Sequence, residues 1–310
     1  MTIATVVYEV NGNSYNLTYD SSSQTWKATI TAPSASSGMN NSGSGPGVPA
    51  ICDGLGYYPG KITVTDTAGN TTVIQTSDTG QLAENLRLYV KETTKPTCSI
   101  TSPTNGAYIK TSTPEITFAV SDAGSGVNPA ACYIKIDSGS YTAVTPVNGV
   151  CTYTPSALAD GAHTIECYCV DYDGNESDHA TASITVDITP PTLNVTSPAD
   201  GSITNVASCT VAGTTNDVTS DPVTLTVKLN SGSPVAVTVN NDGTFSTTIS
   251  LAEGSNTIVI KATDAAGQST TVTRTVTLDT QAPSISAISA TPNPVSVSAS
   301  FVLEVTVTDA

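Results

Sequence analysis

Short stretches in which apolar and polar residues alternate recur along the whole chain. Side chains along a β-strand point to opposite faces in turn, so a period of two indicates strands with one buried and one solvated face. Turn residues, chiefly Gly, Asn and Asp, separate the stretches at roughly ten-residue spacing, which is typical of two-sheet sandwiches. The pattern therefore predicts an all-β protein. The clearest stretches are residues 15–19, 26–30, 61–65, 116–120, 165–171 and 258–264.

A boundary motif divides this pattern into repeats. In each copy an acidic residue stands four positions before a proline, and the prolines at 96, 191 and 283 are 95 and 92 residues apart. That period is close to the size of one β-sandwich domain and too long for a helical solenoid. The sequence therefore predicts domains in tandem. The three copies of the motif span residues 92–96, 187–191 and 279–283.

Four segments follow from these boundaries. Residues 1–92 are predicted to form an amino-terminal β-sandwich with a long Gly/Ser-rich loop at 33–57. Residues 96–188 and 191–279 are predicted to form two further sandwich domains. Residues 283–310 match only the first two strands of another repeat, and two strands cannot bury a sandwich core. We expect this last segment to pair with another chain, to lie against a neighbouring domain, or to be the stub of a truncation.

Two features of the first domain are candidate contact sites. The 33–57 loop has no periodicity of its own, and a loop of that length inside a compact domain is often functional. Together with the terminal strand pair, it is the segment expected to make contacts. Trp26, the one tryptophan of the chain, is expected in the core of this domain, with an exposed binding aromatic as the alternative.

Charge narrows the range of partners. Charged residues make up 12% of the chain, and the formal net charge is −16. A phosphate backbone would be repelled, so nucleic acid is not an expected partner. No apolar run approaches the roughly 18 residues of a membrane span, so membrane insertion is not expected. The first residues alternate like a strand and do not resemble a signal peptide, which predicts a protein that stays where it is made until released, or an excised piece.

The seven cysteines are predicted to be buried thiols. Cys167 and Cys169 share one face of their strand, and they stand where Ile260 and Ala262 stand in the next repeat, so they are expected to pack as small hydrophobes. Unpaired core thiols suggest folding in a reducing cytoplasm. A metal site is the alternative at this Cys-x-Cys pair, although no second His/Cys cluster stands at ligand spacing.

Catalytic motifs are absent from the sequence. Neither His163 nor His179 is framed by a nucleophile or zinc-binding motif. Asp171 and Asp173 lie two positions apart, but a glycosidase pair needs a cleft, which a flat-sided sandwich seldom supplies. We therefore expect no enzymatic activity.

Acidic residues at the domain ends are candidate calcium ligands. Ca²⁺ collects carboxylates and carbonyls from flexible loops, although no Asp-x-Asp-x-Asp-Gly loop is present. Asp171, Asp173 and Asp187 are expected to meet at one joint between domains, and Asp264 and Asp279 at the next. The alternative is that these residues only form turns, that the linker prolines alone provide stiffness, and that the protein needs no cofactor.

Three sequence features together resemble bacterial and phage immunoglobulin-like repeat domains. They are the linker at 187–191, the strand opening that ends in Thr-Ser-Pro at 198, and the Asp-x-x-Gly-Asn turn at 171–175. The resemblance covers nearly the whole chain and implies tandem immunoglobulin-like β-sandwich domains in an elongated array. The first domain lacks the Thr-Ser-Pro opening, and it is similar to amino-terminal units of short, signal-less immunoglobulin-like proteins of tailed phages.

This resemblance implies a non-enzymatic structural or adhesive accessory protein of a bacteriophage virion, associated with tail or capsid and assembled in the bacterial cytoplasm. Its expected partners are other virion proteins or itself through strand pairing, and a host cell-surface glycan. The first alternative is a repeat fragment of a secreted adhesin stalk at the bacterial cell surface. A carbohydrate-binding module attached to an enzyme is the other alternative. It would require exposed coplanar aromatic side chains, and aromatic residues make up only 5% of the chain.

Overall fold

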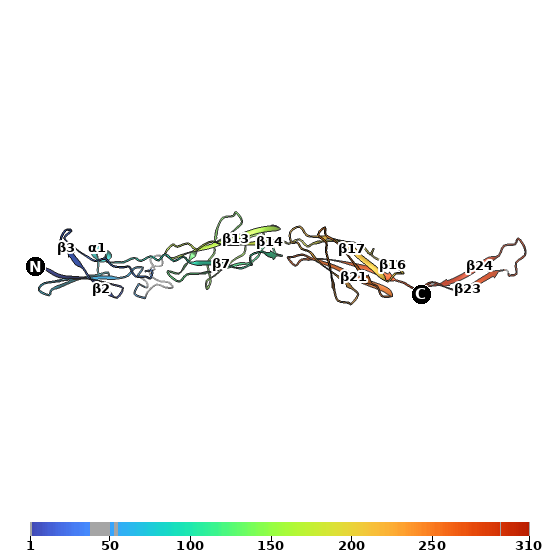
Figure 1. The fold of residues 1–310 in the computed structure, drawn as a ribbon, viewed down its shortest axis with the longest axis horizontal. Coiled ribbons are helices and arrows are strands. Elements are labelled where there is room, and N and C mark those ends of the chain that lie inside the picture. Colours follow the sequence, from blue (N-terminus) through green and yellow to red (C-terminus); the bar gives the residue numbers. More distant parts are fainter. Residues whose placement is uncertain (1, 38–49, 53–54, 292, 310) are drawn as a thin grey trace. The chain divides into compact units, whose positions relative to one another are not determined.

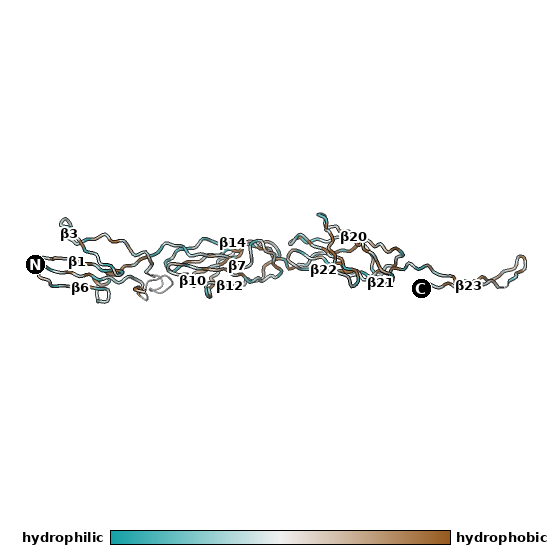
Figure 2. The backbone as a smooth tube through the Cα atoms, turned by 60° about the horizontal axis from the view of Figure 1, so that its bottom comes forward, coloured by the Kyte–Doolittle hydropathy of each residue, from teal (hydrophilic) through white to brown (hydrophobic). Residues whose placement is uncertain are grey.

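The computed structural model describes residues 2–37, 50–52, 55–291 and 293–309, and the regular secondary structure of these residues is almost entirely β-strand (Figure 1). This confirms the predicted all-β class. Hydrophobic and hydrophilic positions are interspersed along the strands (Figure 2), as the alternating pattern requires. No helix among the described residues is long and apolar enough to cross a membrane. The chain divides into two compact units, the first with residues 1–107, 113–158 and 162–185, the second with 108–112, 159–161 and 186–310.

The amino-terminal part of the first unit is a four-stranded sheet in the order β2-β1-β5-β6, with a separate two-stranded sheet β3-β4. Its described core is small and consists of Val10, Cys52, Tyr58 and Val90. Trp26 is not part of this core: it lies half-buried on β4 against Tyr19, because the β3-β4 hairpin forms its own sheet. The elements are β1 (Ile3–Val10), β2 (Asn13–Asn16), β3 (Thr18–Asp20), β4 (Thr25–Lys27), β5 (Gly60–Asp66), β6 (Thr71–Gln75) and the short helix α1 (Gln81–Glu84).

The next domain contains a three-stranded sheet, β12-β9-β7, and a five-stranded sheet, β11-β10-β13-β14-β8. Fully buried side chains come from both sheets, among them Phe118 on β9 and Ile165 on β13, as in a sandwich. The strands are β7 (Thr97–Ser102), β8 (Ala107–Ile109), β9 (Ile116–Ser121), β10 (Val127–Ile136), β11 (Thr142–Ala143), β12 (Val150–Tyr153), β13 (Gly161–Asp171) and β14 (Ala180–Val186).

The main domain of the second unit repeats this plan with the sheets β15-β17-β20 and β16-β22-β21-β18-β19. Gly213 lies on β17 beside a register shift in its pairing with β15, where a Cβ would lie 2.1 Å from the carbonyl oxygen of Asn194. Any larger residue would therefore force these two strands apart. The strands are β15 (Thr192–Ser197), β16 (Ser202–Thr204), β17 (Ser208–Asn216), β18 (Thr224–Leu229), β19 (Val235–Val237), β20 (Thr244–Ser250), β21 (Gly254–Thr263) and β22 (Ser269–Leu278).

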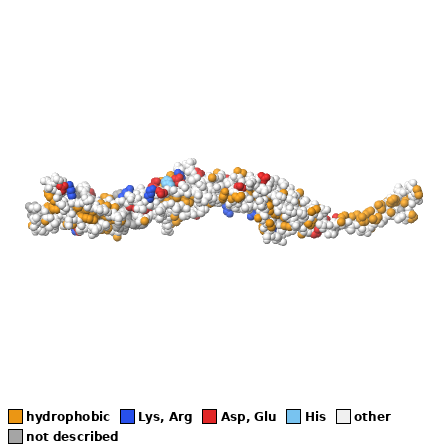
Figure 3. Space-filling model, viewed as in Figure 1, with side chains coloured by type: hydrophobic (Ala, Val, Ile, Leu, Met, Phe, Trp, Pro, Cys, Tyr) orange, Lys and Arg blue, Asp and Glu red, His pale blue; other side chains and the backbone are white. Residues whose placement is uncertain are grey.

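The last described segment is a hairpin of β23 (Ser284–Thr291) and β24 (Val302–Thr308). Its isoleucine, leucine and valine side chains are exposed, and Figure 3 shows hydrophobic side chains along the hairpin. Its pairing register repeats that of the complete sandwiches, because the residue after the linker proline pairs with the residue 24 positions later each time. These pairs are Thr97 with Ser121, Thr192 with Asn216, and Ser284 with Thr308.

The cysteines pack as the sequence predicted. Cys167 and Cys169 are fully buried, as are Ile260 and Ala262 at the matching positions. Six of the seven thiols are buried and Cys98 is half-buried, and all seven are free thiols. Cys98 Sγ lies 3.2 Å from Cys167 Sγ.

Candidate metal centres

Antiparallel pairing brings acidic residues together at the end of each sandwich where the chain enters. β7 leads away from the linker and β9 returns to it, so Asp122, which follows β9, lies near the linker residue Glu92. β13 runs antiparallel to β10, with Asp171 paired to Val127, and therefore ends at the same place. A linker acid, the acid after the strand that pairs with the first strand of the domain, and the acid of the Asp-x-x-Gly turn thus converge.

The Glu92 cluster consists of Glu92, Asp122 and Asp171, and lies within the first unit. One carboxylate oxygen of each residue lies within 4.8 Å of those of the other two. Asp171 is buried, whereas Glu92 and Asp122 are half-buried. The cluster therefore lies partly open to solvent.

Backbone amides of the loop after β9 hold two of these carboxylates. Asp122 Oδ2 accepts hydrogen bonds from the amides of Gly124 (2.8 Å) and Gly126 (2.7 Å), and Glu92 Oε1 accepts one from the amide of Ser125 (2.9 Å). A Cβ on Gly124 would lie 2.2 Å from the Glu92 carboxylate, so the glycine leaves the room that Glu92 occupies. Asp122 Oδ1 is buried and has no hydrogen-bond partner among the described residues.

Asp173 lies beside this cluster and joins it to the amino-terminal domain. Its Oδ2 accepts hydrogen bonds from the Ser36 hydroxyl and from the Glu92 amide (3.0 Å), whereas its buried Oδ1 finds no donor in the described part of the chain. Ser36 belongs to the 33–57 loop, so this described part of the loop contacts the protein itself. Residues 38–49 and 53–54 of that loop lie outside the described residues.

The Asp187 cluster consists of Asp187, Asp217 and Asp264, and lies wholly within the second unit. The three side chains are 0%, 8% and 5% exposed, and each offers a carboxylate oxygen within 4.8 Å of the others. Asp187 accepts from the amide of Thr189 (3.0 Å) and from the Ser220 hydroxyl, and Ser220 also donates its amide to Asp217 Oδ1 (2.8 Å).

The two clusters occupy the same positions of the repeat. In each cluster, the first member stands four residues before the linker proline and the second stands 26 residues after it. The third member begins the turn at the end of the long strand, β13 or β21. In both, an amide side chain of that turn donates to the carbonyl of the linker acid. The pairs are Asn175 with Glu92 (3.1 Å) and Gln268 with Asp187 (2.9 Å).

The structure groups the sequence candidates differently from the prediction. Asp187 meets Asp264, not Asp171 and Asp173, because each turn acid lies where the chain enters its domain and not where it leaves. Asp279 joins neither cluster among the described residues. Its Oδ1 accepts a hydrogen bond from the amide of Gln281 (3.0 Å), which is a turn interaction.

Sequence reasoning missed Glu92, Asp122 and Asp217 as cluster members. The sequence carries a signal for Asp122 and Asp217, because an acid recurs 26 positions after each linker proline, at Asp122, Asp217 and Asp309. Only the pairing of β7 with β9 and of β15 with β17 shows that this position returns to the linker.

Crowding of like charges affects the electrostatics of the first cluster. Burial raises the pKa of Asp171 above its ordinary value, and the nearby Glu92 and Asp122 charges raise it further, while hydrogen bonds from Asn175 act in the opposite direction. No ion pair among the described residues involves a member of either cluster. Each cluster therefore concentrates negative charge without a protein cation to balance it.

The two histidines form surface contacts away from these clusters. His163 Nδ1 lies 2.8 Å from Asp137. His179 stacks on the Tyr168 ring and its Nδ1 lies 2.5 Å from Glu166. The Tyr141 hydroxyl, Lys135 and His179 together lower the pKa of Glu166 to about 2.

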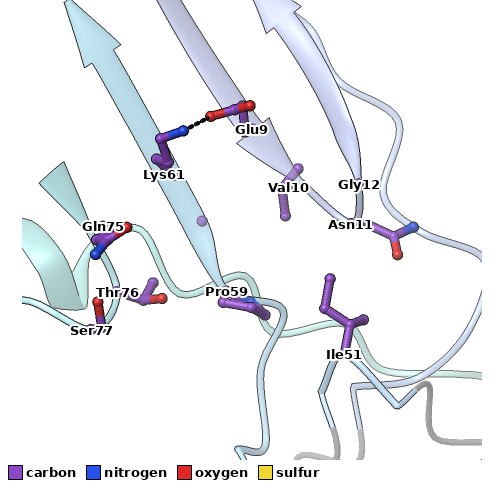
Figure 4. A pocket seen from close by; sticks show the side chains of 11 residues that line it. Glu9, Val10, Asn11, Gly12, Ile51, Pro59, Lys61, Gln75, Thr76 and Ser77 are labelled. Carbon is purple, nitrogen blue, oxygen red and sulfur yellow. Dashed lines mark ion pairs between the residues drawn. The ribbon is translucent and has the colours of Figure 1, made fainter. Parts of the chain in front are cut away.

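A groove of about 400 Å³ lies on the amino-terminal domain, between the β1-β2 turn and the segment leading into β5 (Figure 4). Glu9 and Lys61 form an ion pair of 2.5 Å along one side of it, and Ile51 lies at the other end. Its lining mixes polar side chains with the apolar Val10, Ile51 and Pro59 and includes no histidine or cysteine.

Two parts of the chain match known protein families. Residues 96–166 match the bacterial Ig domain, and residues 191–280 match domain B of glucodextranase. The first of these matches supports the expected immunoglobulin-like domains. No curated protein matches the sequence at a significant level.

Three solved structures to which the chain is similar belong to different kinds of protein. The fibronectin(III)-like modules of Clostridium thermocellum CbhA are 15% identical, with 59% of this chain and 94% of that chain covered and a TM-score of 0.38. Sidekick-1 immunoglobulin domains 1–5 are 12% identical, with 93% and 56% covered and a TM-score of 0.38. The endo-β-1,4-mannanase of Thermotoga petrophila is 17% identical, with 32% and 21% covered and a TM-score of 0.27.

Proposed function

We propose that this protein is a non-enzymatic structural or adhesive accessory component of a bacteriophage virion, attached to tail or capsid and presenting immunoglobulin-like domains. In this proposal it assembles in the bacterial cytoplasm, binds other virion proteins or further copies of itself, and presents its domains toward a host-surface glycan. Seven free thiols, six of them buried, are compatible with assembly in a reducing compartment.

The observation that carries this proposal is the exposed β23-β24 hairpin. Ile285, Ile288 and Leu303 are each about 60% exposed, and Val302, Val305 and Val307 are also exposed. In the complete domain, the strand equivalent to β24 pairs with a third strand, since β17 lies between β15 and β20. The corresponding edge of β24 has no strand beside it among the described residues, and such an edge accepts a strand from a partner.

Removal of the hairpin tests this assembly role. A variant without residues 283–310 should no longer be incorporated into particles, while the double variant Val305→Asp, Val307→Asp should be incorporated poorly, because it places charges on one exposed strand. Thermal unfolding of both variants should match the unchanged protein, since the hairpin adds little buried surface. Undiminished incorporation of both would remove the hairpin from the mechanism.

A second candidate function is a repeat segment of a secreted bacterial adhesin stalk. It is favoured by the register of the hairpin, which repeats the first strand pair of both complete domains and so continues the array. The bacterial Ig domain match at residues 96–166 is equally compatible with such a stalk. Fractionation of the source culture separates the two proposals, because a stalk would remain with the cell envelope.

A further inference from the structure

The Asp187 cluster is a buried concentration of negative charge. Three carboxylates that are at most 8% exposed lie within 4.8 Å of one another, and no lysine, arginine or histidine in the described chain forms an ion pair with them. Burying like charges together is costly unless the group is paired or coordinates a metal. The arrangement therefore calls for a cation or for bound protons.

A second, independent feature is an oxygen without a partner. Asp264 is 5% exposed, and its Oδ1 accepts a hydrogen bond from the amide of Gln268 (2.8 Å). Its Oδ2 is buried and has no donor within reach among the described residues. A buried carboxylate oxygen left unsatisfied costs free energy, and this one belongs to the residue that closes the cluster.

The donor set selects the kind of cation. All candidate ligands are oxygens, from Asp187, Asp217 and Asp264, with the Ser220 hydroxyl adjacent. Neither cysteine nor histidine belongs to the cluster, which disfavours zinc and copper. The ligands come from a linker and two loops. Ca²⁺ tolerates such flexible geometry with six to eight oxygens, whereas Mg²⁺ demands a near-ideal octahedron.

We propose that the Asp187 cluster binds Ca²⁺ through its three carboxylates, and that the Glu92 cluster binds a second Ca²⁺ more weakly. The weaker second site follows from its exposure, since Glu92 and Asp122 are half-buried and their charges are better hydrated. Its unpartnered Asp122 Oδ1 gives it the same kind of unsatisfied oxygen. Each ion fastens a linker acid to the two loops at the entry of its domain.

A residue that binds calcium can be distinguished from an acid that only forms a turn by its response to calcium. Asp66 begins the same Asp-x-x-Gly-Asn turn in the amino-terminal domain, but both its oxygens are bonded, by the amides of Ala68 and Asn70 and by the Asn70 side chain. It belongs to no cluster of acids among the described residues. Asp66→Asn therefore changes a turn of the same type without touching a site, which makes it a matched control.

Calorimetric titration of the whole chain with CaCl₂, after removal of metal by chelator, tests the proposal. The unchanged protein and Asp66→Asn should each show two sites, with far weaker heats for MgCl₂. Asp264→Asn should weaken the tighter site at least ~10-fold while the other site persists. Asp217→Asn should do the same, and it provides a second test if Asp264→Asn folds poorly.

Thermal unfolding distinguishes a metal ligand from a residue that only supports the fold. Without calcium, Asp264→Asn should unfold at the same temperature as the unchanged protein or higher, because one buried negative charge has been removed. With calcium, the unchanged protein should gain stability by mass action and the variant should gain less. No calcium binding, equal binding of Mg²⁺, or full retention of both sites in the two variants would overturn the proposal. None of these readouts depends on association with a virion.

Discussion

At the residue scale, the carboxylates on the surface and those at the domain ends differ in the hydrogen-bond donors that surround them. Tyr141, Lys135 and His179 surround Glu166 with donors, so this carboxylate is stabilised in its charged form. In the Asp187 cluster, the buried Asp264 Oδ2 has no hydrogen-bond donor among the described residues, and the three carboxylates lie close to one another. Residue spacing in the sequence does not show whether a carboxylate is surrounded by hydrogen-bond donors or by other carboxylates, because its neighbours depend on which strands lie side by side.

The histidine of the surface network gives a prediction at this scale. The hydrogen bond to Glu166 raises the pKa of His179 above its ordinary value of 6.5. Its stabilising contribution is therefore complete below pH 6.5 and is lost as the pH rises through the raised pKa. In an NMR titration, Glu166→Gln should lower the pKa of His179. Asp137→Asn, which removes the partner of His163, should leave it unchanged, and an unaltered His179 titration in Glu166→Gln would refute the assignment.

At the scale of the elements, alternation predicted strands at 116–120, 165–171 and 258–264, and the structure has β9, β13 and β21 there. The pairs Cys167 with Ile260 and Cys169 with Ala262 were placed correctly because one face of β13 and of β21 is buried. Trp26 was misplaced, since nothing in its local pattern shows that the β3-β4 hairpin forms a separate sheet. The acids were grouped wrongly because each turn acid was expected to meet the linker acid that follows its domain. In the structure, each turn acid lies beside the linker acid that precedes its domain.

The loop after β9 gives a prediction for an element. Gly124→Ala would push the Glu92 carboxylate aside, since the added Cβ would lie 2.2 Å from it. The lost bond to the Ser125 amide should lower the free energy of unfolding by about 1 kcal/mol, measured in urea. Calorimetry should show weaker calcium binding at the Glu92 cluster alone.

Thr219→Ala is the matched control for Gly124→Ala, because Thr219 holds the equivalent position two residues after Asp217 and already carries a Cβ. It should preserve both sites and change stability by less than about 0.5 kcal/mol. Normal calcium binding at both sites in Gly124→Ala would show that Glu92 is not a ligand.

At the scale of the whole molecule, the proline-marked repeat predicted the domain order, whereas function depends on surfaces that a repeat does not encode. The same register links the two complete domains to the β23-β24 hairpin, and Asp279 and Asp309 stand where Glu92 and Asp122 stand. A virion component and an adhesin stalk can share all of these features. The location of the protein in its source culture separates them.

The most direct test of the proposed function is an immunoblot of the source culture that compares nuclease-resistant particles from a density gradient with washed cell envelopes. We predict a signal in the particle band. A signal confined to the envelope fraction would contradict the virion proposal and favour the adhesin stalk.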